Sequence, residues 1–112
     1  MSNASSVTAS ASVFRIDTFV VPADALPTFI EQIRHIQKIL NTVPGCQKNL
    51  VLTKTEGSKE FNVMTIVEWA STDAMLAAKA VIQGRYAKEG FDPPAFMQRL
   101  GVRATIGLYR ET

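Results

Sequence analysis

Hydrophobic and polar positions repeat with two different periods along this chain, and the change of period predicts its elements. Four stretches, 13–21, 46–54, 61–69 and 102–110, are rich in β-branched and aromatic residues and predict strands. In 24–40 the apolar residues recur every three or four positions, as on one side of a helix: Leu26, Phe29, Ile30, Ile33, Ile36 and Leu40. Ser71 is placed to cap a second helix that runs to Glu89, and Asp92-Pro93 predicts a short third helix to Arg99.

The order of the four strands and the two long helices is β-α-β-β-α-β. This is the order of the ferredoxin-like split βαβ unit, an α+β fold with a four-stranded antiparallel sheet and both helices on one face. Glu56-Gly57-Ser58 predicts the hairpin turn between the middle strands. We therefore expect one ferredoxin-like domain at 13–112, preceded by a flexible Ser/Ala/Thr-rich tail at 1–12.

The predicted sheet has more apolar surface than two long helices can cover. Strand 61–69 places Phe61, Val63, Val67 and Trp69 on one side and Met64 and Ile66 on the other. If the helices lie on one face, the other stays open, and an exposed apolar face of this size indicates an interface. A two-fold axis that pairs the open faces of two copies predicts a homodimer.

Glu68 and Trp69 are adjacent on a strand and must therefore point to opposite faces. We expect Trp69 to face the helices and Glu68 to face the sheet of the partner. The interpretation places Arg15 and Arg103 on the same mixed face as Glu68, so either cation is the expected partner of this carboxylate. A structural role for Glu68 is favoured over catalysis, because an interfacial carboxylate without a cation is costly.

Composition excludes several classes of function. With 12 Lys+Arg against 10 Asp+Glu among 112 residues, the net charge is only +2, and the scattered basic residues argue against nucleic acid as a partner. No apolar run approaches the length of a membrane span, and the chain opens without the pattern of a secretory signal. Cys46 is the only cysteine, and no Cys/His spacing suggests a metal site. These features predict a cytoplasmic protein.

Few side chains offer chemistry. Trp69 is either a core aromatic or a pocket donor through its indole N–H, and Tyr86 projects inward from the second helix with a hydroxyl that needs a partner. His35 is the one residue that titrates near neutrality, but it falls on the polar side of its helix, which favours a solvated position. Cys46 is interpreted as a small packed residue rather than a nucleophile.

From Val13 to Tyr109 the chain resembles the antibiotic biosynthesis monooxygenase (ABM) domain of the dimeric α+β barrel superfamily. The resemblance lies in Pro44-Gly45-Cys46, in Ile66-Val67-Glu68-Trp69, in Ser71-Thr72-Asp73-Ala74 and in Gly107-Leu108-Tyr109. It implies a homodimer whose sheets face each other as a barrel, with a cleft between sheet and helices in each subunit.

The resemblance also implies a choice of chemistries. Haem-degrading members use a His on the second helix and an Asn on the first strand, and this chain has neither, so haem is not expected. Cofactor-free members oxidise phenols and quinols with Trp, Tyr, Arg and Asn side chains, which here implies Trp69, Tyr86 and Arg85 as catalytic residues. Asn62 has the opposite strand parity to Trp69 and matches less well.

The expected function is therefore a monooxygenase that acts on a small phenolic, quinol or polyketide-like substrate without cofactor or metal. Two alternatives remain open on the same scaffold. One is an isomerase of a small oxygenated metabolite, and the other is a non-catalytic dimeric binding protein. The apolar segment 91–100 is either a lid over the cleft or a connection that caps the core.

Overall fold

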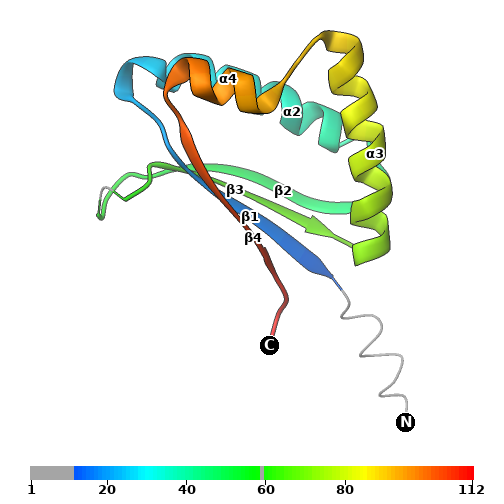
Figure 1. The fold of residues 1–112 in the computed structure, drawn as a ribbon. Coiled ribbons are helices and arrows are strands. Elements are labelled where there is room, and N and C mark those ends of the chain that lie inside the picture. Colours follow the sequence, from blue (N-terminus) through cyan, green and yellow to red (C-terminus); the bar gives the residue numbers. More distant parts are fainter. Residues whose placement is uncertain (1–11, 59) are drawn as a thin grey trace.

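The computed structural model describes residues 12–58 and 60–112 and confirms the predicted ferredoxin-like architecture. Its elements are β1 (Val13–Val20), η1 (Ala23–Ala25), α2 (Leu26–Leu40), β2 (Cys46–Thr53), β3 (Val63–Trp69), α3 (Thr72–Glu89), α4 (Pro93–Leu100) and β4 (Arg103–Tyr109). The strands form one antiparallel sheet in the order β2-β3-β1-β4, and the helices lie on one face of it (Figure 1). The tail predicted at 1–12 lies, apart from Ser12, outside the described residues.

The helix ends follow the predicted capping residues. The Ser71 hydroxyl accepts a hydrogen bond from the Ala74 N–H at 3.0 Å, and the Asp92 carboxylate accepts one from the Ala95 N–H at 3.4 Å. Gly90 ends α3 in a left-handed conformation with φ of 68°. The predicted helix 24–40 instead begins as the 3-10 turn η1 and becomes α-helical at Leu26.

The strand register assigns every sheet residue to one of two faces. The helix-side face carries Val13, Arg15, Asp17 and Phe19 of β1, Val63, Thr65, Val67 and Trp69 of β3, and Ala104, Ile106 and Leu108 of β4. The open face carries Phe14, Ile16, Thr18 and Val20 of β1, Lys48, Leu50 and Leu52 of β2, Met64, Ile66 and Glu68 of β3, and Arg103, Thr105, Gly107 and Tyr109 of β4. Helices therefore cover one face only, as the sequence predicted.

The core lies between the helix-side face and the helices, in two clusters. The first cluster consists of Phe19, Val21, Ala25, Phe29, Val63, Phe96 and Val102. The second consists of Val13, Val43, Val67, Trp69 and Ala78. Trp69 thus faces the helices, as predicted, and packs with α3. Phe96 anchors α4 in the first cluster, which favours the core-capping interpretation of segment 91–100.

The expected pairing of Glu68 with Arg15 is wrong. Glu68 lies opposite Phe14 on the open face, whereas Arg15 lies opposite Val67 on the helix-side face. The two side chains are therefore on opposite sides of the sheet. The cation directly across from Glu68 on its own face is Lys48, on β2.

Candidate functional site

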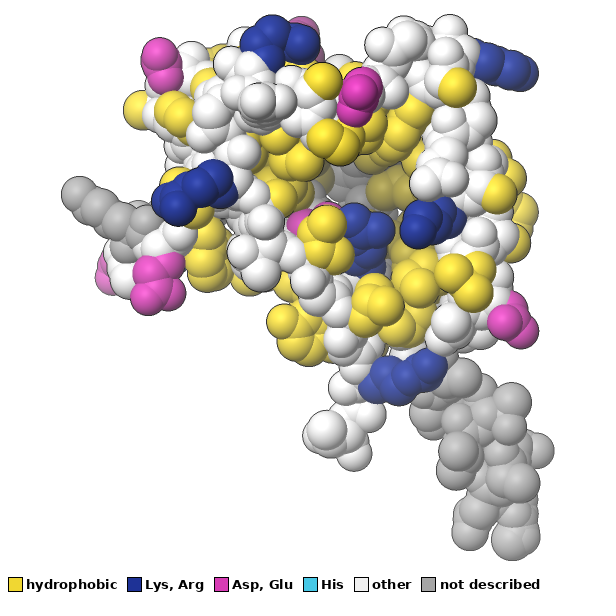
Figure 2. Space-filling view, in the orientation of Figure 1, with side chains coloured by type: hydrophobic (Ala, Val, Ile, Leu, Met, Phe, Trp, Pro, Cys, Tyr) yellow, Lys and Arg dark blue, Asp and Glu magenta, His cyan; other side chains and the backbone are white. Residues whose placement is uncertain are grey.

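The helices are displaced toward one edge of the sheet, and this leaves a cleft over the other edge. The α2 helix is tied to β2 by two hydrogen bonds of 3.0 Å between Gln37 and Asn49. At the opposite edge, Ile106 and Leu108 lie on the helix-side face of β4 but remain 57% and 56% exposed. Figure 2 shows a hollow here, between the helices and the sheet, with basic and acidic side chains among hydrophobic ones. We call this hollow over β1 and β4 the cleft.

Two charged side chains stand on the helix-side face beneath the cleft. Arg15 and Asp17 are the charged residues on this face of β1, β3 and β4, and their spacing of two along β1 places them side by side. The Arg15 Nε donates to Asp17 Oδ1 at 3.1 Å and its Nη2 donates to Asp17 Oδ2 at 3.4 Å. The side chains are 41% and 16% exposed, so the pair is half-buried but open to the cleft.

Sequence reasoning missed this pair as a site. Arg15 was assigned to the open face, because the even positions of β1, with Phe14 and Ile16, are more apolar than the odd positions that carry the two charges. The Arg-x-Asp spacing was the available signal, since two charges on one face of an otherwise apolar strand need a common explanation. Only the register with β3 and β4 shows which face carries them.

Tyr86 approaches the same region from α3. Its ring packs edge-to-face on Phe91 with centroids 5.1 Å apart, and Phe91 packs in the same way on Phe96 at 5.4 Å. Burial raises the pKa of the Tyr86 hydroxyl, while the positive charge of Arg15 opposes the rise and the negative charge of Glu89 adds to it. The structure therefore brings Tyr86 within electrostatic reach of Arg15.

Trp69 lies deeper, at 4% exposure, in the second core cluster. The partly buried Met75 and Ile82 of α3 and Cys46 of β2 pack against that cluster. No hydrogen bond joins its indole N–H to another described residue. Every fully buried side-chain nitrogen or oxygen among the described residues has a partner, so this nitrogen is not sealed from the surface. No described contact joins Trp69 to Tyr86, although both face inward from neighbouring elements.

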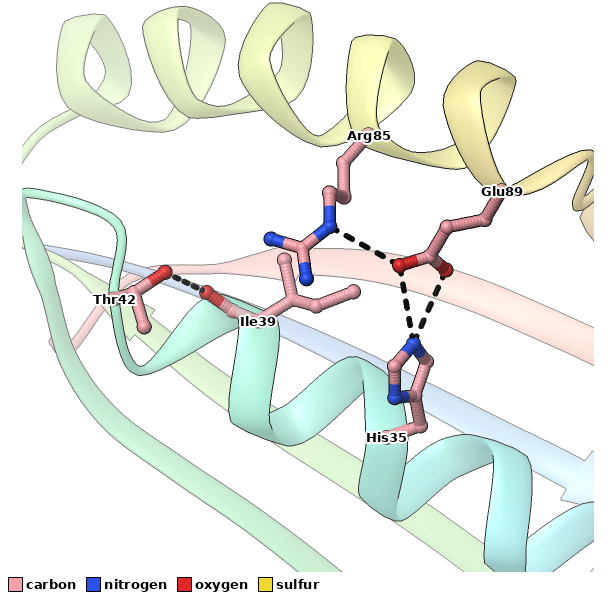
Figure 3. A network of polar contacts seen from close by, with 5 residues as sticks. All are labelled: His35, Ile39, Thr42, Arg85 and Glu89. Carbon is pink, nitrogen blue, oxygen red and sulfur yellow. Dashed lines mark hydrogen bonds and ion pairs between the residues drawn. The ribbon is translucent and has the colours of Figure 1, made fainter.

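Arg85 belongs to a polar network between α2 and α3. The Arg85 Nε donates to Glu89 Oε2 at 3.0 Å, and the His35 Nε2 lies 3.1 Å from Glu89 Oε1 (Figure 3). The bonds from His35 and Arg85 lower the pKa of the Glu89 carboxyl. His35 is exposed, as predicted, but it is bonded to Glu89 rather than solvated alone. Arg85 is therefore tied to the joint between the helices, and its side chain is 50% exposed.

Two other candidates are structural. Cys46 packs against the second core cluster, and burial raises the pKa of its thiol, which disfavours the thiolate that a nucleophile needs. Asn62 spans two segments, because its side-chain amide donates to the Val21 carbonyl and accepts from the Val21 N–H, both at 2.9 Å. Its polar atoms are thus engaged with backbone and do not face the cleft.

A second depression of about 360 Å³ lies beside the loop between β2 and β3. It is lined in part by Lys54, Phe61 and Asn62. The Lys54 ammonium donates to the Ser58 carbonyl at 2.7 Å and lies 4.2 Å from the centre of the Phe61 ring. Because the Lys54 and Asn62 side chains are already engaged, this depression offers less to a ligand than the cleft.

Within residues 12–58 and 60–112, no cluster of three or more His, Cys, Asp or Glu side chains is arranged to hold a metal ion. None of the helices in this part of the chain combines the length and the apolar character needed to span a bilayer.

Solved structures with this fold include several oxygenases, although no protein-family model and no curated protein sequence matches the chain. A candidate monooxygenase from Shewanella loihica is 23% identical, with 92% of this chain and 96% of that chain covered and a TM-score of 0.69. A candidate antibiotic biosynthesis monooxygenase from Deinococcus radiodurans is 20% identical over 89% and 92% of the two chains, with a TM-score of 0.66. SnoaB from Streptomyces nogalater, a cofactor-independent oxygenase, is 22% identical over 90% and 93%, with a TM-score of 0.60.

A haem-degrading protein also has this fold. MhuD from Mycobacterium tuberculosis, solved with two haems in its active site, is 20% identical over 89% of this chain and 95% of its own, with a TM-score of 0.56. At these identities the comparisons establish a shared fold. They agree with the resemblance to the ABM domain that the sequence motifs indicate, and they leave the chemistry to the residues of the cleft.

Proposed function

We propose that this protein is a cofactor-independent monooxygenase of the ABM type, which oxidises a small phenolic or quinol substrate with molecular oxygen. The observation that carries the proposal is the cleft over β1 and β4, which combines exposed apolar residues with Arg15, Asp17 and Tyr86 on facing elements. The fold shared with SnoaB and with the candidate monooxygenases supports the same reaction class.

The reaction requires few catalytic groups from the protein. A phenolate or hydroquinone anion is electron-rich enough to reduce oxygen itself, so that one oxygen atom enters the ring and the other leaves as water. The protein contributes a cleft of low polarity and donors aimed at the oxygen atoms that carry charge. The Tyr86 hydroxyl and the Arg15 guanidinium are donors at this cleft, and the Ile106 and Leu108 side chains supply apolar contact.

The three catalytic residues that the family resemblance implies are supported by different observations. Tyr86 packs on Phe91 and keeps its proposed role as a donor, and the effect of the Arg15 charge on its hydroxyl supports that role. Trp69 has an indole nitrogen that is not sealed, so a role beneath the substrate remains part of the proposal. Arg85 is engaged with Glu89, and we assign it the task of holding α3 against α2 at the cleft wall.

Haem is not part of the proposal. The described helix α3 contains no His that could serve as an axial ligand, and β1 contains no Asn. Arg15 and Asp17 instead place an ion pair on the helix-side face of β1. MhuD shares the fold, but the side chains of this cleft do not fit its cofactor.

Oxygen consumption tests the proposal directly. The purified protein is incubated with a panel of hydroquinones and naphthols, and substrate-dependent oxygen uptake is expected for at least one of them. Trp69→Phe preserves most of the buried ring and removes the N–H. If the indole N–H is a donor, the rate of oxygen uptake should fall by a factor of roughly ten or more. Unchanged rates in Trp69→Phe place the indole in the core only, and no uptake across the panel contradicts the proposed reaction.

A second candidate function is an isomerase of a small oxygenated metabolite. The observation that favours it is the partly exposed Asp17 carboxylate beside Arg15, whose charge acts on the Tyr86 hydroxyl; a carboxylate and a hydroxyl are the acid and base that proton transfer needs. Exchange of carbon-bound hydrogen for solvent deuterium without oxygen uptake distinguishes this function. A binding protein without catalysis shows neither signal.

We also propose that the molecule works as a homodimer through its open face. Leu50, Leu52 and Tyr109 are 41%, 44% and 54% exposed on that face in the single subunit. An apolar surface of this kind is normally covered in solution. The cleft lies on the opposite face, so dimerisation leaves it accessible. The lone Cys46 remains consistent with the cytoplasm predicted from the sequence.

A further inference from the structure

We propose that the cleft recognises an aromatic ligand through one oxyanion, a carboxylate or a phenolate, which Arg15 binds in an orientation fixed by Asp17. The inference rests on the proposed function for the cleft and goes beyond it by naming the ligand class and the residue that selects it.

The geometry of the ion pair leaves one edge of the guanidinium available. Asp17 engages the Nε and Nη2 of Arg15, at 3.1 and 3.4 Å, so the Nη1 donors have no described partner. With 41% of the Arg15 side chain exposed, this edge reaches the open space of the cleft. A planar guanidinium held on one side by a carboxylate presents its remaining donors in a fixed direction, as recognition of an oxyanion requires.

The surroundings indicate that the ligand is aromatic. The exposed Ile106 and Leu108 flank Arg15 and Asp17 on β4, because the register pairs Asp17 with Ile106 and Arg15 with Leu108. On α3, Tyr86, on which the charge of Arg15 acts, forms an edge-to-face aromatic pair with Phe91. Apolar and aromatic side chains of this kind favour a flat apolar ring, and the Tyr86 hydroxyl is a second donor within electrostatic reach of Arg15.

Charge balance limits the ligand to one oxyanion. Asp17 already neutralises Arg15, so this ion pair carries no excess positive charge. A single carboxylate or phenolate gains charge-assisted hydrogen bonds from Arg15, whereas a second carboxylate beside the ion pair adds repulsion from Asp17. Among the described residues of β1, β3 and β4, no other cation lies on the helix-side face.

Calorimetric binding of a matched pair of probes tests this inference. We use 2-naphthoate and its neutral analogue 2-naphthamide, which have the same ring and nearly the same shape. The wild type is expected to bind 2-naphthoate at least roughly tenfold more tightly than 2-naphthamide, because a hydrogen bond to a charged group is stronger than one to a neutral group. A naphthalene dicarboxylate is expected to bind no more tightly than 2-naphthoate.

Arg15→Gln is expected to weaken 2-naphthoate binding roughly ten- to hundredfold and to leave 2-naphthamide binding nearly unchanged. Arg34→Gln is the matched control, because Arg34 is exposed on α2 and makes no described ion pair; its affinities should equal those of the wild type. If Arg15→Gln folds poorly with Asp17 left unpaired, the double variant Arg15→Gln/Asp17→Asn removes both charges, and it should bind the two probes equally.

The outcomes separate this inference from the proposed reaction. Equal affinity of the wild type for both probes, or no binding of either, overturns the inference, and so does an equal loss of both in Arg15→Gln. Selective 2-naphthoate binding without oxygen uptake by any substrate in the panel keeps the recognition role and rejects the oxygenase. Oxygen uptake that is unaffected in Arg15→Gln, with no preference for 2-naphthoate, keeps the oxygenase and rejects the recognition role.

Discussion

At the scale of single residues, the site depends on where the charges fall on the sheet. Arg15 and Asp17 interrupt an apolar face, and each would be costly there without the other, because a half-buried charge loses part of its hydration. Their mutual bonds reduce that cost, and the exposed edge of Arg15 remains for a ligand. A pair that only stabilised the fold would not need an open cleft above it.

Glycines 45 and 84 form a matched pair for testing how tightly the chain packs behind Trp69. Gly45 has φ of +89°, and a Cβ added to it would lie 2.7 Å from the Cβ of Ala74. Gly45→Ala is therefore expected to lower the free energy of unfolding by about 3 kcal/mol, through backbone strain and overpacking. Urea unfolding at neutral pH measures the change.

Gly84→Ala is the control for this prediction. Gly84 lies inside α3, and a Cβ there meets nothing within 4 Å, so the substitution should raise the free energy of unfolding by roughly 0.5–1 kcal/mol. If Gly45→Ala is as stable as the wild type, the close contact between the start of β2 and the first turn of α3 is wrong.

The sequence predicted that alternate strand residues point to opposite faces of the sheet, but for some strands it did not predict which set of residues faces the helices. In β3 the two faces differ in apolar character, so Trp69 was assigned correctly to the helix side. In β1 the odd positions include Arg15 and Asp17 while the even positions include Phe14 and Ile16, so the pattern favoured the wrong face for the charges. Because one step of register exchanges the faces, only long-range pairing with β3 resolves this choice.

At the scale of elements, α3 has two tasks along its length. Its first half packs Met75 and Ala78 against the cluster of Trp69, and its last turns pack Tyr86 on Phe91. The Arg85, Glu89 and His35 network then fixes the end of α3 to α2 (Figure 3). The capping residue and the Ala content of the sequence predicted the helix itself. The contact between residues 35 and 89 could not be predicted, because these residues meet only in the fold.

The network predicts a pH-dependent contribution to stability. The folded state lowers the pKa of Glu89, so the unfolded state binds more protons in acid, and the contribution is present above the unfolded pKa and lost as the pH falls through the folded value. Glu89→Gln should therefore be less stable than the wild type at pH 7, and the difference should be smaller at pH 3. Urea unfolding at both pH values measures this difference.

Glu31→Gln is the control, because Glu31 is exposed on α2 and forms no described ion pair. It should show no comparable difference at pH 7. A difference between Glu89→Gln and the wild type that persists unchanged at pH 3 would mean that the Glu89 side chain acts through packing rather than through its charge.

At the scale of the whole molecule, the two faces of the sheet have separate tasks. The helix-side face carries the core and the cleft, and the open face carries apolar residues from all four strands. Of these, Leu52 and Tyr109 are exposed, whereas Phe14 and Met64 are half-buried. The imbalance between apolar strands and two long helices was visible in the sequence, so the open face was predicted correctly.

Leu52→Glu tests the proposed homodimer without disturbing the core. Leu52 is 44% exposed on β2, so a single subunit tolerates the charge, but a two-fold interface would bury two such carboxylates near apolar surface. We expect a dimer for the wild type and a folded monomer for Leu52→Glu in sedimentation equilibrium at micromolar concentration.

Ala80→Glu, on the exposed side of α3, is the control and should remain a dimer. A wild-type protein that sediments as a folded monomer would contradict the dimer, and a dimer that survives Leu52→Glu unchanged would place the interface elsewhere than on the open face.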